Sequence, residues 1–328
     1  MKKTEEKNVN MQAVREAMLA MTRQCWEQGI TAQALLETED WDRLKIVVHD
    51  MVLRQSEDGR LCNVENTPAV TDSAFCIPAV YLLGKRLHKE DYVAAAERNI
   101  SFLLEKAAAA EDGTLFHMKG TGEVWADSAA YLPYALALTG HEKEGWQQMK
   151  GITSRLYDPE RGLYYHMWDE NSGKYLRALC WGVGNGWILT GLLRLIAVCR
   201  ETSENSGVDV GEMRRMFHDL LDRMLELETP EHGFHDILDD EQTFQETETA
   251  AMVAYAIYRG IQEGEVSREY RERADNIRQY VLTKISPEGL VWDAASSPSF
   301  DHPGTAVECQ AHVLIMEKEY QRVECSNF

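Results

Sequence analysis

The sequence has little of what marks several common protein classes. Its 328 residues contain no CxxC or HExxH spacing, so we do not expect a zinc site. Residues 1–10 lack the apolar run that a secretory signal needs after its basic residues, and no other stretch approaches a membrane span. The seven cysteines are odd in number and scattered, which suits reduced thiols. We therefore expect a cytoplasmic protein.

Positive charge is also scarce. Lys and Arg number 34 against 54 Asp and Glu, which gives a formal net charge of −20. Nucleic acids and anionic membranes would be repelled over most of such a surface. Neither is expected as a principal partner, and the sequence leaves open whether the chain forms a homo-oligomer.

Linkers and low-complexity segments are missing as well. Hydrophobic residues make up 44% and charged residues 27% of the chain, which is enough apolar surface for a sizeable core. A chain of this length can form two domains, yet toroids and barrels of this size often form one. We predict a flexible N-terminus at residues 1–10 and a single domain over residues 11–328.

What the sequence has instead is an internal repeat. An apolar helix rich in small residues begins about 13 to 24 residues after each of five glycine turns, and the helix starts recur at intervals of about 55 to 60 residues. In each turn an apolar or aromatic residue follows the glycine, which predicts a short strand. The five turns are Asp58-Gly59-Arg60-Leu61, Asp112-Gly113-Thr114-Leu115, Arg161-Gly162-Leu163-Tyr164, His232-Gly233-Phe234 and Glu288-Gly289-Leu290.

The repeat predicts an all-α fold, an (α/α)6 toroid with short β-hairpin turns at one rim. Ranges 129–139 and 188–198 are apolar most of the way round, as inner helices would be. Amphipathic ranges with charged faces predict the outer helices, namely 41–55, 91–106, 212–228 and 267–284. The marked inner helices begin near Thr71-Asp72-Ser73-Ala74, Trp125-Ala126-Asp127-Ser128, Gly184-Asn185-Gly186-Trp187, Glu246-Thr247-Glu248-Thr249 and Gly304-Thr305-Ala306, with a weaker copy near Trp26.

The loops before the inner helices of such a ring open at one end, so a functional site is expected at that rim. Six of the eight tryptophans lie in these segments, and only Trp41 and Trp146 lie on outer helices. Their rings offer flat platforms on which a sugar can stack, although each ring can equally cap the barrel core. The six are Trp26, Trp125, Trp168, Trp181, Trp187 and Trp292.

Carboxylates lie in the same segments. Asp72, Asp127 and Glu248 each precede Ser or Thr at a helix start, where an acidic residue is often only an N-cap or a first-turn acid. Asp127 stands apart because Trp125 flanks it, and a Trp wall would desolvate the carboxyl group and raise its pKa toward the range useful for proton donation. We therefore expect Asp127 to carry the chemistry.

Two histidines follow glycine turns near these carboxylates. His117 lies in Leu115-Phe116-His117-Met118, and His166 lies in Tyr164-Tyr165-His166-Met167. A neutral histidine at the rim can orient a sugar hydroxyl or a carboxylate, or it can simply be satisfied by the backbone.

These motifs resemble glycoside hydrolase family 105, the unsaturated rhamnogalacturonyl hydrolases, and more distantly the unsaturated glucuronyl hydrolases of family 88. The resemblance spans nearly the whole chain. Its most specific element is Gly184-Asn185-Gly186-Trp187 with Trp181 upstream. The other elements are Trp125-Ala126-Asp127, Gly162-Leu163-Tyr164-Tyr165-His166-Met167-Trp168-Asp169-Glu170 and Glu246-Thr247-Glu248-Thr249-Ala250-Ala251.

The resemblance implies roles for the residues in these motifs. Asp127 would be the general acid and base, and Asp72 would assist it. The residues that would bind the substrate are His117, Trp125, His166, Trp181 and Trp187, together with Asn185 and Glu248 from the same motifs.

The resemblance also implies a reaction. The family acts on the terminal 4,5-unsaturated uronate that polysaccharide lyases leave on an oligosaccharide. C4 of the vinyl ether is protonated, water adds at C5, and the hemiketal opens and releases the aglycone. No metal or organic cofactor is implied.

One position departs from the family pattern. Val183 stands where the family usually has an Arg before Gly-Asn-Gly-Trp, placed to meet the substrate. A uronate carboxylate needs donors, and a bidentate Arg is the usual one. Lys119 follows the His117 strand and Arg177 leads into Trp181. We expect one of these two cations to replace the Arg and bind the uronate, with an altered choice of aglycone.

Three other functions fit the same residues. An inverting glycosidase would use Asp127 as acid and Glu248 as base on a saturated sugar. A sugar epimerase would use the rim histidines as acid and base. A sugar-binding toroid would have kept the pocket and lost catalysis.

Overall fold

The computed structural model describes residues 10–62 and 68–326. The predicted flexible segment at residues 1–10 lies outside the described residues except for Asn10. The Asn10 side chain accepts hydrogen bonds from the backbone N–H groups of Gln12 and Ala13, and so caps the first helix, α1 (Met11–Met21).

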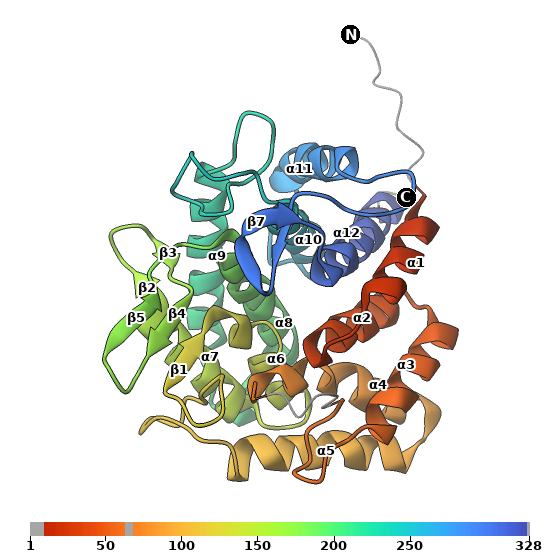
Figure 1. Cartoon of the computed structure of the whole chain (residues 1–328), viewed down its shortest axis with the longest axis vertical. Coiled ribbons are helices and arrows are strands. Elements are labelled where there is room, and N and C mark those ends of the chain that lie inside the picture. The colour runs from red at the N-terminus through yellow and green to blue at the C-terminus, as the bar shows by residue number, and fades with distance from the viewer. Residues whose placement is uncertain (1–9, 63–67, 327–328) are drawn as a thin grey trace.

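Six inner helices form a closed ring (Figure 1). Each contacts the next inner helix along the chain, and the last one packs against the first. Most of their residues are buried because they are surrounded by neighbours on several sides. These helices are α2 (Cys25–Glu37), α4 (Ile77–Leu87), α6 (Leu132–Leu138), α8 (Gly182–Ser206), α10 (Thr247–Glu263) and α12 (Val307–Cys325).

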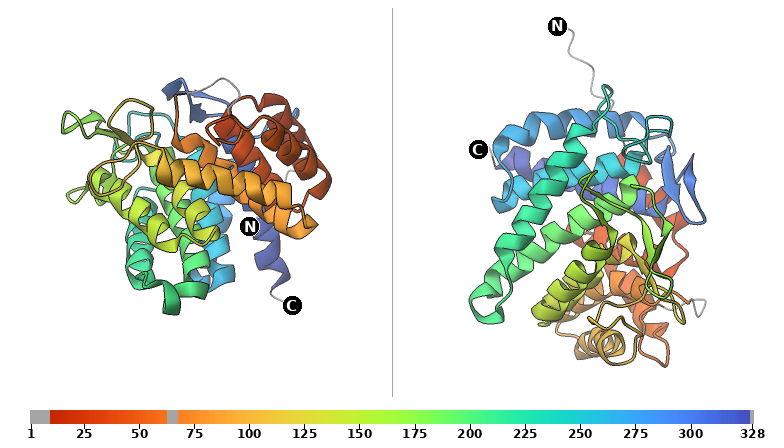
Figure 2. Two further views of the ribbon diagram at one scale, coloured as in Figure 1. Left: turned by 90° about the horizontal axis from the view of Figure 1, so that it is seen from below. Right: turned by 90° about the vertical axis from the view of Figure 1, so that its left-hand side faces the viewer.

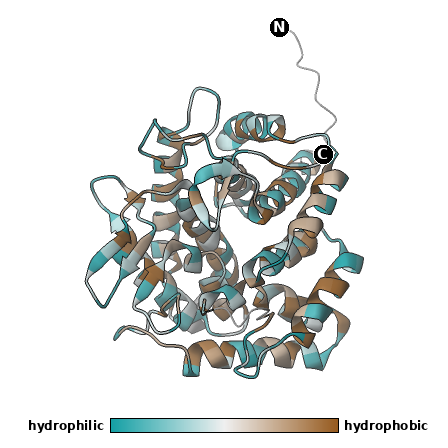
Figure 3. Ribbon diagram, in the orientation of Figure 1, coloured by the Kyte–Doolittle hydropathy of each residue, from teal (hydrophilic) through white to brown (hydrophobic). Residues whose placement is uncertain are grey.

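Outer helices alternate with the inner ones along the chain and pack against them (Figure 2). In α9, the buried Val210, Met213, Phe217 and Leu220 recur at spacings of three and four, and charged residues lie between them. Hydrophilic and hydrophobic residues accordingly alternate along the outer helices (Figure 3). With α1, the outer set comprises α3 (Trp41–Leu53), α5 (Glu90–Glu105), α7 (Glu142–Leu156), α9 (Val210–Glu226) and α11 (Arg271–Thr283).

This alternation confirms the predicted α/α toroid. Buried apolar residues from every one of these helices form one continuous cluster. The division into a single domain over residues 11–328 stays a prediction.

Helix α8 corrects one expectation from the sequence. Its segment Gly182–Glu201 is long and apolar enough to cross a membrane, although no such stretch was expected. The segment is 89% buried within the protein, because α8 is an inner helix surrounded by the ring. Its apolar character is therefore explained by core packing.

The glycine turns keep one backbone feature in most copies of the repeat. Gly59, Gly113, Gly162 and Gly289 all have positive φ, which favours glycine. In the remaining copy the positive φ falls on His232, one residue before the glycine. The sequence pattern thus located all five turns. In the turn at Gly233, however, it did not identify His232 as the residue with positive φ.

Short strands and 3₁₀ turns complete the described fold. A three-stranded antiparallel sheet has the order β1-β4-β5, and two hairpins pair β2 with β3 and β6 with β7. Two 3₁₀ turns lead into inner helices, η1 into α4 and η2 into α6, and η3 precedes α11. The bounds are β1 (Glu123–Trp125), β2 (Tyr157–Asp158), β3 (Leu163–Tyr164), β4 (Met167–Asp169), β5 (Lys174–Arg177), β6 (Ala294–Ser296), β7 (Ser299–Gly304), η1 (Thr71–Phe75), η2 (Ala126–Ala129) and η3 (Arg268–Tyr270).

Candidate active site

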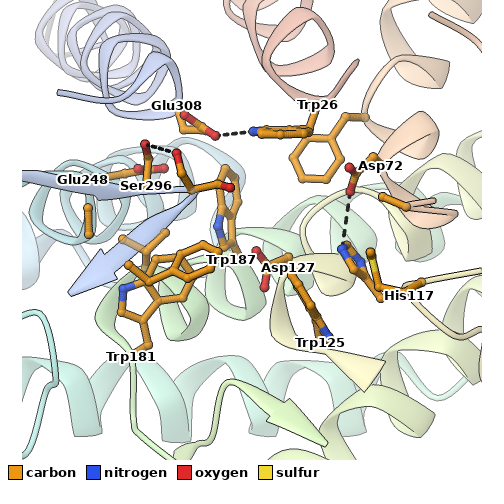
Figure 4. A pocket seen from close by; sticks show the side chains of 17 residues that line it. Trp26, Asp72, His117, Trp125, Asp127, Trp181, Trp187, Glu248, Ser296 and Glu308 are labelled. Carbon is orange, nitrogen blue, oxygen red and sulfur yellow. Dashed lines mark hydrogen bonds and ion pairs between the residues drawn. The ribbon is translucent and has the colours of Figure 1, made fainter. Parts of the chain in front are cut away.

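A cavity of about 200 Å³ opens at the rim where the inner helices begin. Residues far apart in sequence line it, from Trp26 on α2 to Glu308 on α12 (Figure 4). Its aromatic walls are Trp26, Trp125, Trp181 and Trp187.

Four carboxyl groups line this cavity, and each is the second residue of an element that begins at the rim. Asp72 and Asp127 lie in the first turns of the 3₁₀ elements η1 and η2, whose N-cap residues are Val70 and Trp125. Glu246 does cap a helix, because it accepts from the backbone N–H of Thr249. The N-cap explanation therefore applies to Glu246 and not to Asp72 or Asp127. The other two carboxyl groups in the lining belong to Glu248 and Glu308.

Asp127 is held by a histidine. Nε2 of His166 lies 3.0 Å from Oδ2 of Asp127, and Nδ1 of His166 lies 2.9 Å from Nη1 of Arg177. A guanidinium group only donates, so Nδ1 accepts and Nε2 carries the proton that points at Asp127. Burial alone would raise the pKa of Asp127, but the interaction with His166 outweighs it and keeps the pKa below its ordinary value.

The surroundings of Asp72 raise its pKa, in contrast to those of Asp127. Its nearest basic partner is Nε2 of His117 at 3.7 Å, while Nδ1 of His117 is engaged by the hydroxyl groups of Thr71 at 2.7 Å and Ser128 at 3.2 Å. Burial, followed by the negative charges of Asp127 and Glu308, raises the pKa of Asp72 to about 7. Burial also lowers the pKa of His117 to about 4, so this imidazole is neutral near neutral pH.

The two aspartates therefore differ in charge, and one expectation from the sequence is wrong. Trp125 was expected to raise the pKa of Asp127, but His166 lowers it, and the raised pKa belongs to Asp72. The Trp125 ring instead stacks on His117, with ring centroids 4.2 Å apart, and its Nε1 donates to Glu123.

The other two carboxyl groups of the cavity are also buried. Nε1 of Trp26 donates to Glu308 at 2.6 Å, and burial raises the pKa of Glu308 to about 7. Nδ1 of His312 lies 3.0 Å from Glu248, whose pKa is raised well above its usual range by burial and then by the charge of Glu308. Among the described residues that line this cavity, none is Lys or Arg.

The hairpin formed by β6 and β7 covers one side of the cavity. Phe300 and Ser296 of this hairpin are among the lining residues. The Phe300 ring packs edge-on against Trp181, with centroids 5.3 Å apart, and Nε1 of Trp181 donates to Asp236 at 3.0 Å. The hairpin thus encloses the cavity from the side opposite Trp125 (Figure 4).

Comparison with known proteins agrees with the fold. A family model described as Glycosyl Hydrolase Family 88 matches residues 1–306. The chain belongs to Glycosyl Hydrolase Family 88. It is a glycoside hydrolase, and the predicted resemblance to families 105 and 88 is confirmed.

Sequence similarity relates this family 88 hydrolase to a curated protein, and structural similarity relates it to many solved structures. The unsaturated rhamnogalacturonyl hydrolase YesR of Bacillus subtilis (strain 168) is 25% identical over 250 residues, which cover 71% of this chain and 69% of that protein. A possible family 105 member from Salmonella enterica superposes with a TM-score of 0.84 at 16% identity, covering 99% of this chain and 97% of that one. A family 105 hydrolase from C. acetobutylicum superposes with a TM-score of 0.78 at 16% identity, with coverages of 95% and 99%.

Seven of the predicted site residues of this hydrolase line the cavity. His166 does not, because it lies fully buried behind Asp127. Asn185 does not either: its side chain accepts from the N–H of Tyr164 and donates to the carbonyl groups of Tyr164 and Trp181. The expectation that Asn185 contacts substrate is therefore corrected, since its amide holds β3 against α8. The seven in the lining are Asp72, His117, Trp125, Asp127, Trp181, Trp187 and Glu248.

Two of the six rim tryptophans also lie away from the cavity lining. Nε1 of Trp168 donates to Glu170 on the surface of the β1-β4-β5 sheet, and the Trp292 side chain is about half exposed. Their place in the repeat brought them to the rim, but their side chains point elsewhere.

The position that departs from the family pattern does face the cavity. Val183 is buried in the lining, and neither candidate replacement cation joins it there. Lys119 is exposed to solvent, and Arg177 lies behind His166 and Phe300.

Sequence reasoning missed Glu308, Ser296, Phe300 and Asp236. Glu308 had a signal, because it follows the helix start at Gly304-Thr305-Ala306 in the same register as Asp72 and Glu248. Ser296 and Phe300 lie in the β6-β7 hairpin, between the turn at Gly289 and α12, and no sequence motif marked them. Among the described residues, no group of three or more His, Cys, Asp or Glu side chains is placed to hold a metal ion.

Proposed function

We propose that this family 88 hydrolase releases a terminal 4,5-unsaturated uronic acid from oligosaccharides that a polysaccharide lyase has cut. The observation that carries the proposal is the pair Asp127 and Asp72, which face one tryptophan-walled cavity with unequal affinities for a proton. The relatives support the substrate class: one is an unsaturated rhamnogalacturonyl hydrolase, and a solved structure of the same fold is an unsaturated glucuronyl hydrolase specific for heparin.

The reaction needs one proton delivered and one removed. C4 of the vinyl ether must receive a proton, and the water that adds at C5 must lose one. At neutral pH Asp72 still holds a proton in part of the molecules, whereas Asp127 is ionised. These charge states favour Asp72 as the proton donor and Asp127 as the base toward water, in place of one residue performing both transfers.

The substrate carboxylate must be accepted without a cation in the cavity lining. Burial favours the neutral form of Glu248 and leaves Asp72 and Glu308 partly protonated at neutral pH. A protonated carboxyl group donates a hydrogen bond to a carboxylate and does not repel it. The cavity therefore accepts a uronate best at neutral or slightly acidic pH.

The geometry argues against two of the alternative functions. Glu248 is a poor base for an inverting glycosidase, because burial raises its pKa well above its usual range and so favours its protonated form. An epimerase that used the rim histidines would need both at the substrate, but His166 has no exposed surface.

The test compares unsaturated glucuronyl and galacturonyl disaccharides with saturated neutral glycosides. We expect the unsaturated uronides to be cleaved, with loss of the ultraviolet absorbance of the alkene and release of a reducing end. The ordinary glycosidase becomes the better reading if saturated neutral glycosides are cleaved equally well. A sugar-binding toroid becomes the better reading if no glycoside is cleaved but the uronides bind.

We also propose that the protein acts in the cytoplasm. The support is its cysteine chemistry: within the described residues all seven cysteines are free, and six are buried in the helical ring. Fractionation of cells that express the full chain tests this, and recovery of the active protein outside the cytoplasm would contradict it.

A further inference from the structure

Arg177 ends strand β5 and reaches inward behind the cavity. Its Nη1 donates to Nδ1 of His166 at 2.9 Å, and its Nη2 lies 3.5 Å from the carbonyl oxygen of Phe300. The guanidinium group lies 5.6 Å from the ring centroid of Trp181 and 5.8 Å from that of Phe300. Arg177 is therefore packed between His166 and the β6-β7 hairpin, and it is not part of the cavity lining.

This contact determines which nitrogen of His166 carries the proton. A guanidinium group has N–H groups on every side and no lone pair to accept with, so Nδ1 of His166 must present its own lone pair. The single proton of the neutral ring then lies on Nε2, 3.0 Å from Oδ2 of Asp127. A proton on Nδ1 would instead meet the N–H of Arg177 and leave Asp127 facing a lone pair.

The His166 ring has no freedom to turn over. Trp181 packs on one side with centroids 4.4 Å apart, and Phe300 meets the ring edge-on at 5.3 Å. Trp125 meets it edge-on at 5.9 Å, and the side chain has no exposed surface. With the ring fixed, its tautomer is the remaining variable, and Arg177 sets it.

We propose that Arg177 is a positioning residue that holds His166 in the Nε2–H tautomer, so that Asp127 receives a hydrogen bond and stays ionised and oriented for the reaction. This proposal rests on the proposed role of Asp127 in hydrolysis. It also assigns Arg177 a role other than binding the uronate carboxylate, which the sequence had predicted for either Lys119 or Arg177. The same arrangement of donor, histidine and carboxylate is a recurrent way to fix a tautomer.

The test uses variants that differ in what they offer to Nδ1. Arg177→Lys keeps a donor that cannot accept, Arg177→Gln offers an oxygen that can accept from an Nδ1–H, and Arg177→Ala offers neither. Lys174→Ala is the matched control, since Lys174 is an exposed cation on the same strand. The readouts are kcat and KM on an unsaturated uronyl disaccharide and the ¹⁵N spectrum of histidine-labelled protein, with the His166 signals assigned from a His166→Gln sample.

We expect wild type, Arg177→Lys and Lys174→Ala to show the Nε2–H tautomer of His166. Arg177→Gln and Arg177→Ala should show a second form protonated at Nδ1. We also expect kcat to fall at least about tenfold in the Gln and Ala variants, with recovery of most of it in the Lys variant and KM changing less than about twofold throughout. Melting curves and circular dichroism identify any variant that fails to fold, and the comparison of Lys with Gln stands without Ala.

Two results would overturn the proposal. One is an unchanged His166 tautomer in both Arg177→Gln and Arg177→Ala. The other is a KM for uronides that rises at least about tenfold in Arg177→Ala with kcat unchanged, because this would place Arg177 on the substrate carboxylate. If the wild-type protein cleaves no unsaturated uronide, the proposed function fails, while the ¹⁵N spectra still decide whether Arg177 sets the tautomer.

Discussion

The helical ring has two open ends, here called its mouths, and buried carboxyl groups are paired with cations at only one of them. At the mouth where the inner helices begin, four carboxyl groups line a cavity, and no Lys or Arg from the described part of the chain lies in its lining. At the other mouth, where these helices end, a cavity of about 530 Å³ has carboxylates in ion pairs. There Glu37 lies 3.4 Å from both Arg194 and Arg259, and Glu263 lies 2.5 Å from Arg259.

The difference shows in the acidity of two carboxyl groups that are about equally buried. Burial would raise the pKa of Glu37, but Arg194 and then Arg259 outweigh it, so the pKa lies below its ordinary value. Without such partners, burial raises the pKa of Asp72 to about 7. Ion pairs with Arg keep Glu37 ionised at one mouth. At the mouth with the active site, Asp72 has no such partner and can exchange a proton with a ligand near neutral pH.

The largest effect is expected from removing the ionised carboxylate at the active mouth. Asp127→Asn keeps the shape of the side chain but cannot take up or release a proton. Loss of general acid and base function typically lowers turnover by about 10² to 10⁴. Steady-state kinetics, with circular dichroism as the control for folding, measure this. Near wild-type turnover in a folded Asp127→Asn protein would assign the proton transfers to another residue.

Removing an ion pair at the other mouth should lower the free energy of unfolding and leave turnover unchanged. Glu37→Gln leaves Arg194, which is 2% exposed, without its carboxylate partner. Removal of one partner from a buried ion pair destabilises a protein by about 3 to 5 kcal/mol. Glu201→Gln is the control, because Glu201 borders the same cavity but is exposed. Urea unfolding measures the free energy, and equal stability of the two variants would remove the contrast between the mouths.

Asp72→Asn should sharpen the contrast by making the protein more stable and less active. The pKa of Asp72 is raised on folding, so the wild-type protein loses stability as the pH rises from about 4 to about 7. Asn has no such loss, and the variant should gain on the order of 4 kcal/mol at pH 8 and little at pH 4. Thermal melts at the two pH values check this. An equal gain at both would mean that Asp72 does not titrate in this range.

The smallest effect is expected from a chelator. Four carboxyl groups at one mouth resemble a cation site in composition, yet no compact ligand group was predicted from the sequence. We expect turnover to be unchanged in EDTA. Loss of activity that calcium or zinc restores would contradict the proposed mechanism.

The features that the sequence predicted correctly are those that recur with the repeat. The spacing of the helix starts located the inner ring, and it placed Asp72 and Asp127 in the same register of successive repeats because the backbone repeats there. The same register marks Glu308, so this residue was predictable from the pattern, although it was not predicted. Phe300 was not predicted, although its hairpin β6-β7 precedes the inner helix α12 just as the pair β4-β5 precedes α8.

The charge state of the site depended on contacts that no periodicity encodes. His166 is 39 positions from Asp127, and Arg177 is a further 11 positions along the chain. Whether Trp125 or His166 controls the pKa of Asp127 is decided by the orientation of side chains around one buried ring. Asn185 shows the same limit: its motif was specific, but its amide serves the backbone of Tyr164 and not the cavity.

The closure of α12 onto α2 has a consequence for how activity is acquired during folding. Trp26 and Glu308 share a hydrogen bond across the cavity although 282 positions separate them. Contacts this distant in sequence require a large loop to close, and chains rich in them fold slowly. Each helical hairpin can form early from local contacts, but the cavity is complete only when the first and last inner helices meet. In a refolding experiment, helical signal should therefore return before turnover does.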